Sequence, residues 1–87
     1  MPIQVTIEAG WKAEAQLIAN ELPMRADARS WRGFGVIRVG VKSKQETNDL
    51  MEAVSRSFHA HSLKWARVRY GDEERVFKAN GKSHRAA

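Results

Sequence analysis

Apolar and polar side chains alternate with a period of two near the start of the chain. Residues 3–8, with the sequence IQVTIE, are apolar at the odd positions and polar at the even positions. This pattern is typical of a strand that buries one of its faces. We therefore predict a strand that Gly10 ends.

A helical period follows this strand. Trp11, Ala15, Ile18 and Leu22 recur every three or four residues, so they share one face of a helix. Pro23 ends the pattern, because a proline disfavours helical backbone in the residue before it. We expect the helix to bury this face, with Trp11 in the core.

Residues 24–33 have no clear period and are basic. We predict a loop here, with a short helical turn over residues 26–29. Trp31 has two interpretations: it closes one end of the core as a lid, or it contacts a ligand. The arginines of this segment are Arg25, Arg29 and Arg32.

Alternation returns in residues 34–41, 64–70 and 75–79, which we predict to be strands. Residues 71–74 contain glycine and three acidic residues and predict a hairpin turn between the last two strands. Asn80 and Gly81 are a further turn signal.

A second helix is predicted between these strands. Ser43 and Glu46 have the spacing of a capping box, in which each side chain binds the backbone N–H of the other residue. The helix ends near residues 59–62. Its buried face consists of Leu50, Met51, Val54 and Phe58.

The predicted order of elements is β-α-β-α-β-β. We expect an α+β fold, namely a two-layer sandwich with one mostly four-stranded sheet and two helices on one face. Residues 1–81 form a single domain in this prediction, and residues 82–87 form a frayed basic tail.

The chain is small, basic and free of cysteine, with 87 residues and a formal net charge of +5. Without cysteine it has no disulfides and no thiolate metal sites. Its first ten residues lack the basic head and apolar run of a signal peptide, and no apolar run is long enough to span a membrane. We expect a cytoplasmic protein, and the positive charge attracts polyanions.

The sheet face opposite the predicted core combines aromatic rings with arginines. Such a face binds single-stranded nucleic acid when bases stack on the rings and guanidinium groups meet the phosphates. We predict that Phe34, Arg38, Trp65 and Arg67 form one contiguous exposed patch. The full set of predicted nucleic-acid-binding residues is Arg29, Trp31, Arg32, Phe34, Arg38, Trp65, Arg67 and Arg69.

Residues 32–39, RGFGVIRV, are similar to the ribonucleoprotein octapeptide of RNA-recognition-motif domains, whose pattern is K/R-G-F/Y-G/A-F-V-x-F/Y. Residues 32–35 match it, and Ile37 is a conservative match. Val36 and Val39 replace two aromatic residues, and Gln4 stands where the companion motif on the first strand has another. We also predict no strand between the first helix and the octapeptide, where this family requires one.

The starts of the two predicted helices suggest an anion site. Both predicted helices begin after a strand, so we expect their N-termini at one edge of the sheet, where Lys12, Lys42 and Lys44 make an anion site. Glu14 and Glu46 lie in the same first turns, where their negative charges already compensate the positive ends of the helix dipoles. This favours a purely structural interpretation.

The residues that could support catalysis form no recognisable set. His59 and His61 are two positions apart, which places them on different faces of a helix rather than in a metal pair. We predict no catalytic residue, no metal and no cofactor. An acid and a base could still meet in the folded chain, for example His59 or His61 with Glu73.

The leading hypothesis is a small nucleic-acid-binding protein that prefers RNA or single-stranded DNA, because no helix has the basic outer face that a duplex groove requires. The alternative is a protein-interaction module or a homodimer that buries the same face, since Trp, Phe and Arg are also common in interface hot spots. A small hydrolase or nuclease is the third possibility.

Overall fold

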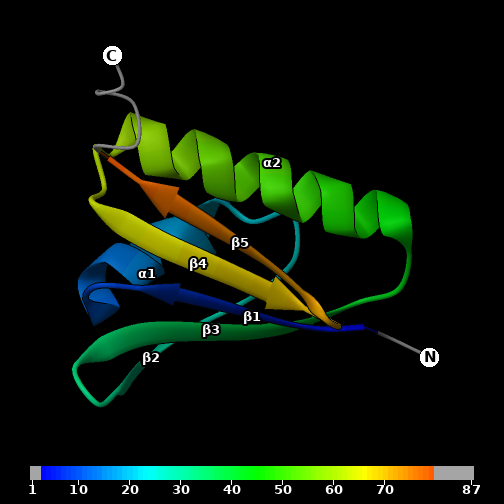
Figure 1. Cartoon of the computed structure of the whole chain (residues 1–87), viewed down its shortest axis with the longest axis horizontal. Coiled ribbons are helices and arrows are strands. Elements are labelled where there is room, and N and C mark those ends of the chain that lie inside the picture. Colours follow the sequence, from blue (N-terminus) through cyan, green and yellow to red (C-terminus); the bar gives the residue numbers. More distant parts are fainter. Residues whose placement is uncertain (1–2, 80–87) are drawn as a thin grey trace.

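The computed structural model describes residues 3–79, which form two helices and one five-stranded antiparallel sheet (Figure 1). The predicted α+β class is confirmed. The predicted tail over residues 82–87 and the turn signal at Asn80 and Gly81 lie outside the described residues. The elements are β1 (Ile3–Ala9), α1 (Lys12–Glu21), β2 (Ala28–Trp31), β3 (Phe34–Val41), α2 (Lys44–Ala60), β4 (Trp65–Tyr70) and β5 (Glu73–Lys78).

The sheet has the strand order β2-β3-β1-β4-β5, and all neighbouring strands are antiparallel. β1 is therefore central, and each helix connects two parallel strands that have a third strand between them. The first six elements have the β-α-β-β-α-β order of a split β-α-β fold. The predicted order was wrong because it lacked one strand.

The missing strand is β2, in the segment that was predicted as a loop with a helical turn. It pairs with β3 through a two-residue turn, in which Arg32 has a φ of 52° and Gly33 a φ of 86°. Positive φ at both central residues is the geometry that suits tight hairpins. β2 has only four residues, of which Ala28 alone is buried, so it carries no detectable alternation.

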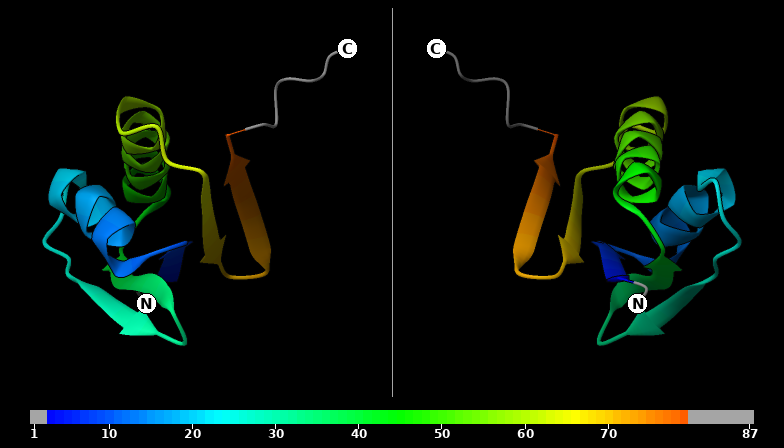
Figure 2. Two further views of the ribbon diagram at one scale, coloured as in Figure 1. Left: turned by 90° about the vertical axis from the view of Figure 1, so that its left-hand side faces the viewer. Right: turned by 90° about the vertical axis from the view of Figure 1, so that its right-hand side faces the viewer.

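The core lies between the helices and one face of the sheet, and Figure 2 shows both helices on the same side of the sheet. The odd-numbered residues of β1 and β3 face this core, as do alternate residues of β4. The largest fully buried side chains are those of Ile7, Ile18, Ile37 and Leu50. In residues 3–79, neither helix has the length and apolar character needed to cross a membrane.

α1 lies very close to β3 at Gly35. A Cβ atom on Gly35 would be 2.4 Å from the carbonyl oxygen of Trp11 and 2.6 Å from the Cβ atom of Ala15. The backbone at Trp11 is extended, so the helix begins only at Lys12. The prediction that Trp11 lies in the core is wrong: its side chain is 69% exposed, because the residue stands before the first helical turn.

The N-terminus of α2 is capped by the predicted pair of residues, with one difference. The backbone N–H of Glu46 donates to Ser43 Oγ at 3.2 Å. The Glu46 carboxylate accepts from the N–H of Lys42, at 2.6 Å, rather than from that of Ser43. The helix thus starts where the sequence predicts and ends at Ala60, within the predicted range.

The two helix N-termini lie at opposite ends of the sheet, so the predicted joint anion site is wrong. α1 follows the end of β1 and α2 follows the end of β3, and these two strands are antiparallel (Figure 1). Lys12 is therefore separated from Lys42 and Lys44 by the length of the sheet. The prediction assumed parallel strands because it lacked β2, which reverses the chain.

Candidate nucleic-acid interface

The predicted binding residues come from β2, β3 and β4 and from the turn between β2 and β3. The side chains of Trp31 and Phe34 are 55% and 45% exposed. Trp65 and Arg67 are half-buried. Neither Phe34 nor Trp65 thus belongs to the core beneath the helices. The exposed members of the predicted set are Arg29, Trp31, Arg32, Phe34, Arg38 and Arg69.

Three rings gather at one end of the open face, and we call Trp31, Phe34 and Trp65 the aromatic end. Trp31 is paired with Phe34 across the β2–β3 hairpin. The ring centroids of Phe34 and Trp65 are 6.0 Å apart, with 46° between the ring planes. These two rings meet because β1, which separates β3 from β4, ends at Ala9.

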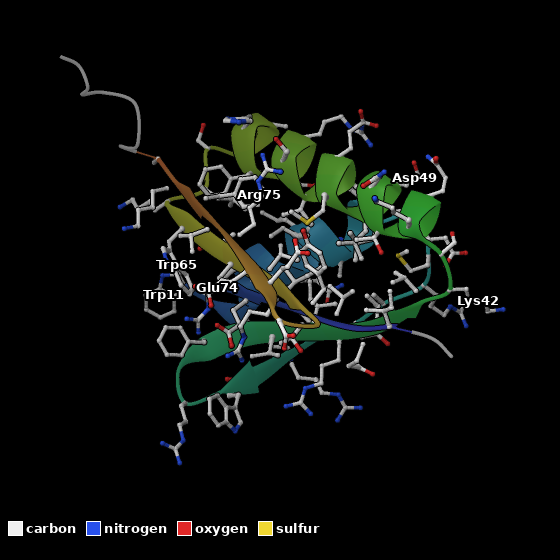
Figure 3. The ribbon with its side chains drawn as sticks, turned by 45° about the vertical axis from the view of Figure 1, so that its right-hand side comes forward. Trp11, Lys42, Asp49, Trp65, Glu74 and Arg75 are labelled. Carbon is white, nitrogen blue, oxygen red and sulfur yellow. The ribbon has the colours of Figure 1, made fainter. Side chains whose placement is uncertain are left out.

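Trp11 adds a fourth ring, which is exposed, at the same end of the molecule. Its carbonyl oxygen lies against Gly35, the neighbour of Phe34. Figure 3 shows Trp11 and Trp65 at one end and Lys42 at the other. Sequence reasoning missed Trp11 as a surface residue. Its position directly after Gly10 could have indicated this, because the residue before the first helical turn is a cap and does not share the buried face of the helix.

Two arginines lie over rings of the aromatic end. The guanidinium carbon of Arg32 is 4.9 Å from the ring centroid of Trp31, and that of Arg67 is 5.6 Å from the ring centroid of Trp65. These distances are in the range of cation–π interactions. The rings are thus held beside positive charge, at positions that a base and its phosphate could share.

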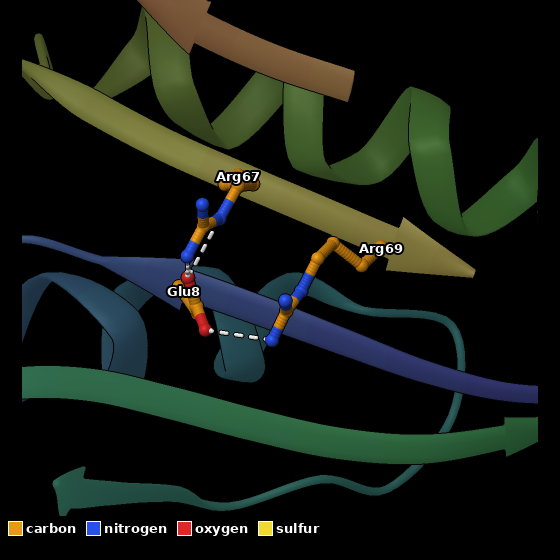
Figure 4. Close-up of polar contacts among 3 residues, drawn as sticks. All are labelled: Glu8, Arg67 and Arg69. Atoms are coloured by element: carbon orange, nitrogen blue, oxygen red, sulfur yellow. Dashed lines mark hydrogen bonds and ion pairs between the residues drawn. The ribbon is translucent and has the colours of Figure 1, made fainter. Parts of the chain in front are cut away.

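A buried carboxylate lies near the end of the central strand, beside two arginines of β4 (Figure 4). Glu8 on β1 is only 8% exposed. Its Oε1 accepts hydrogen bonds from Nε of Arg67 at 2.8 Å and from Nη2 of the same side chain, and its Oε2 accepts from Nη2 of Arg69 at 3.3 Å. Two of the predicted phosphate-binding arginines are therefore already engaged with an anion.

Sequence reasoning placed Glu8 on the open face but gave it no role. The register explains the role, since Glu8 lies opposite Arg67 on β4 and opposite Val36 on β3. Carboxylates accept several hydrogen bonds at once, and those from arginine are strong because both partners are charged. Glu8 fixes the positions of Arg67 and Arg69 and neutralises one of their two charges.

A pocket of about 400 Å³ opens on the β2–β3 part of the same face. Its volume is at the lower end of the range of about 300–1,000 Å³ that small-molecule sites span. Val36, which is 8% exposed, contributes apolar surface at the position where the octapeptide pattern has an aromatic ring. The lining residues are Asp27, Arg29, Ser30, Trp31, Val36 and Arg38.

The octapeptide segment contributes to both the turn and β3. Its first two residues form the hairpin turn, Phe34 is exposed, and Gly35 admits α1. β2 supplies a strand between α1 and the octapeptide, where the resemblance requires one. On β1, however, Gln4 lies opposite Gly40 and Glu8 opposite Val36, so the central strand offers no stacking ring.

No protein-family model matches this chain, and no significant match was found among curated proteins or solved structures. The functional argument therefore rests on the residues themselves.

A separate polar cluster connects the C-terminal parts of the two helices. Ser57 Oγ donates to Glu21 Oε1 at 2.7 Å, and Nε2 of His61 lies 2.6 Å from Glu21 Oε2. The hydrogen bonds from His61 and then Ser57 lower the pKa of the Glu21 carboxyl. Because the carboxylate stands between the buried hydroxyl and the imidazole, this cluster contains no nucleophile–base pair.

The described residues do not bring the histidines of α2 and Glu73 together as an acid–base pair. Within residues 3–79, neither His59 nor His61 forms an ion pair with Glu73, which instead lies opposite Tyr70 at the start of β5. The same residues contain no cluster of three or more His, Cys, Asp or Glu side chains that could hold a metal ion.

Proposed function

We propose that this protein binds single-stranded nucleic acid, either RNA or single-stranded DNA, on the open face of its sheet. The proposal treats the domain as a two-layer sandwich whose helices cover only one face, and it places the protein in the cytoplasm. The observation that carries it is the aromatic end, where the exposed ring of Trp31 and the half-buried ring of Trp65 each lie within cation–π distance of an arginine. Stacking of a base on an aromatic ring contributes about 1–3 kcal/mol and tolerates any base.

The positions of the arginines suggest a direction for the bound strand. Bases stack on Trp31, Phe34 and Trp65, and the strand continues from the aromatic end toward Arg29 and Arg38, which are exposed. Among the described residues, these two arginines have no carboxylate partner within ion-pair distance. They are therefore available to phosphates, whereas Arg67 and Arg69 already form ion pairs with Glu8.

Fluorescence anisotropy of a labelled oligonucleotide of mixed sequence tests this proposal at several salt concentrations. We expect salt-sensitive binding, which is the mark of phosphate contacts. Phe34→Ala and Trp65→Ala should each weaken binding by about 1–3 kcal/mol per stacked base, with little change in the salt dependence. Leu17→Ala is the matched control, because Leu17 is an exposed apolar residue on α1, outside the sheet.

If the wild-type protein binds no single-stranded oligonucleotide at low ionic strength, the open face is not a nucleic-acid site. A response of Leu17→Ala equal to that of Trp65→Ala would show that binding is not localised at the aromatic end.

A second candidate is a protein interface, either with a partner or with another copy of this chain, on the same face. The observation in its favour is the number of large apolar side chains left exposed there, among them Trp31 and Phe34. Such residues dominate the energetics of protein interfaces. Sedimentation velocity distinguishes the candidates: a homodimer through this face persists at high salt and dissociates in Trp65→Ala, whereas nucleic-acid binding weakens steeply with salt.

A further inference from the structure

The pocket beside Trp31 contains the carboxylate of Asp27, together with Arg29, Arg38 and the ring of Trp31. This carboxylate differs from that of Glu8 on the same face, which two arginines bind. In the described part of the chain, Asp27 accepts no hydrogen bond and forms no ion pair. A carboxylate is not needed to bind phosphate. Because it only accepts hydrogen bonds, an unpaired carboxylate in this pocket suits a neutral ligand that donates them.

The pocket exists because Val36 occupies a position where a large ring would fill the space. Val36 lies opposite Arg29, and Trp31 follows two residues later on the same side of β2. A flat ligand can therefore enter beside the Trp31 ring, over the side chain of Val36, with Asp27 at its edge. This arrangement combines one stacking surface with one charged acceptor.

The four common bases differ in the hydrogen-bond donors that they can present to a carboxylate. An ionised carboxylate has two oxygen atoms that accept and none that donates. Guanine is the one common base whose Watson–Crick edge presents two adjacent donors, N1–H and the 2-amino group, which match both oxygens. Adenine and cytosine offer an amino group beside an unprotonated ring nitrogen, and uracil offers an imino group between two carbonyl oxygens.

We propose that this pocket binds a guanine base of the single-stranded ligand, with stacking on Trp31 and two hydrogen bonds to Asp27. The inference rests on the proposed function and adds base preference at one position. Arg29 and Arg38 contact the phosphates on either side of the base. Their two charges exceed that of Asp27, so the carboxylate does not make the pocket repel the nucleic-acid backbone.

The test compares short oligouridines that carry one central guanosine, inosine or adenosine. Inosine keeps N1–H but lacks the 2-amino group, and adenosine lacks both donors. By anisotropy, we expect the wild-type protein to bind the guanosine oligonucleotide about tenfold more tightly than the adenosine one, with inosine between them; a bidentate base contact has a discrimination of this size.

Two variants assign this preference to the carboxylate. Asp27→Asn replaces one acceptor oxygen with a donor, so the preference for guanosine over adenosine is lost. Asp72→Asn removes the same charge from an exposed turn and keeps the preference. Arg38→Ala weakens binding to all three oligonucleotides by the same factor, because a phosphate contact does not read the base.

The results separate this inference from the proposed function. Equal affinities for the three oligonucleotides, or a guanosine preference that survives in Asp27→Asn, overturn the guanine pocket while binding on the open face stands. Absence of binding to every oligonucleotide overturns both.

Discussion

Gly33 and Gly35 are two positions apart in the chain and meet different physical requirements. Gly33 has a φ of 86°, and a Cβ atom there would meet nothing within 4 Å. It needs the backbone freedom of glycine for the hairpin turn. Gly35 needs the absence of a side chain, because α1 lies directly on it. Between them they set Phe34 on the open face and bring Trp11 to the same end.

Alanine at these two positions should therefore have unequal effects. We expect Gly35→Ala to lower the free energy of unfolding by about 3 kcal/mol, because the added methyl group overlaps backbone atoms of α1 that cannot move independently. Gly33→Ala should cost about 1 kcal/mol, the strain of a left-handed residue. Urea denaturation followed by circular dichroism measures both, and a larger loss for Gly33→Ala would contradict the close packing at Gly35.

At the scale of elements, α2 is positioned at both of its ends by specific polar contacts. Ser43 and Glu46 satisfy backbone N–H groups at the start of the helix. Near its other end, Ser57 and His61 bind Glu21, the last residue of α1. The cap fixes the start of α2, and the Glu21 contacts join the two helices to each other. The residues of the aromatic end and the pocket make none of these contacts.

The N-terminal cap gives a prediction for stability alone. Ser43→Ala removes the acceptor for the Glu46 N–H, so we expect a loss of about 1 kcal/mol in the free energy of unfolding. Oligonucleotide affinity should not change. Ser55→Ala in the middle of α2 is the control and should be close to neutral. A cap variant as stable as the wild type would show that water replaces the hydroxyl without cost.

The Glu21 contact predicts a dependence of stability on pH. Folding lowers the pKa of Glu21 below its ordinary value of 4.5. The contact therefore stabilises the folded protein above about pH 4.5 and is lost as the pH falls through the lower pKa of the folded state. In urea denaturation across this acidic range, Glu21→Gln should lose less stability than the wild type. The control Glu52→Gln should follow the wild-type curve.

The whole molecule carries a net charge of +5, but that charge is not distributed evenly over the open face. Glu8 neutralises part of the positive charge of β4, while Arg29 on β2 and Arg38 on β3 have no carboxylate within ion-pair distance in residues 3–79. If nucleic acid binds here, the balance between Glu8 and the phosphates sets how many counterions are released.

Glu8→Gln tests this balance. The amide no longer neutralises Arg67 and Arg69, so we expect tighter binding of single-stranded oligonucleotides and a slope of log affinity against log salt that is steeper by about one unit. Glu74→Gln removes a carboxylate at the rim of the same face and should steepen the slope less. An unchanged slope in Glu8→Gln would mean that Arg67 and Arg69 do not contact phosphate.

The sequence by itself determined the local elements of this protein. Both helices and the strands over residues 3–9, 34–41 and 65–70 follow from periodicity, because each buries one face. The final hairpin follows from the turn residues 71–74 between two alternating segments. The same periodicity put Phe34 and Arg38 on the face opposite the core. These predictions needed only neighbours along the chain.

The tertiary structure alone decided how the segments pair. β2 is a four-residue edge strand. It is a strand because it pairs with β3, and not because its own residues alternate between apolar and polar. Its presence made β1 and β3 antiparallel, separated the helix N-termini and set Glu8 opposite Arg67. The pocket with Asp27 arises in the same way, from side chains on two paired strands. Register between segments is a property of the assembled sheet, because it depends on which strands are neighbours and not on the residues adjacent in sequence.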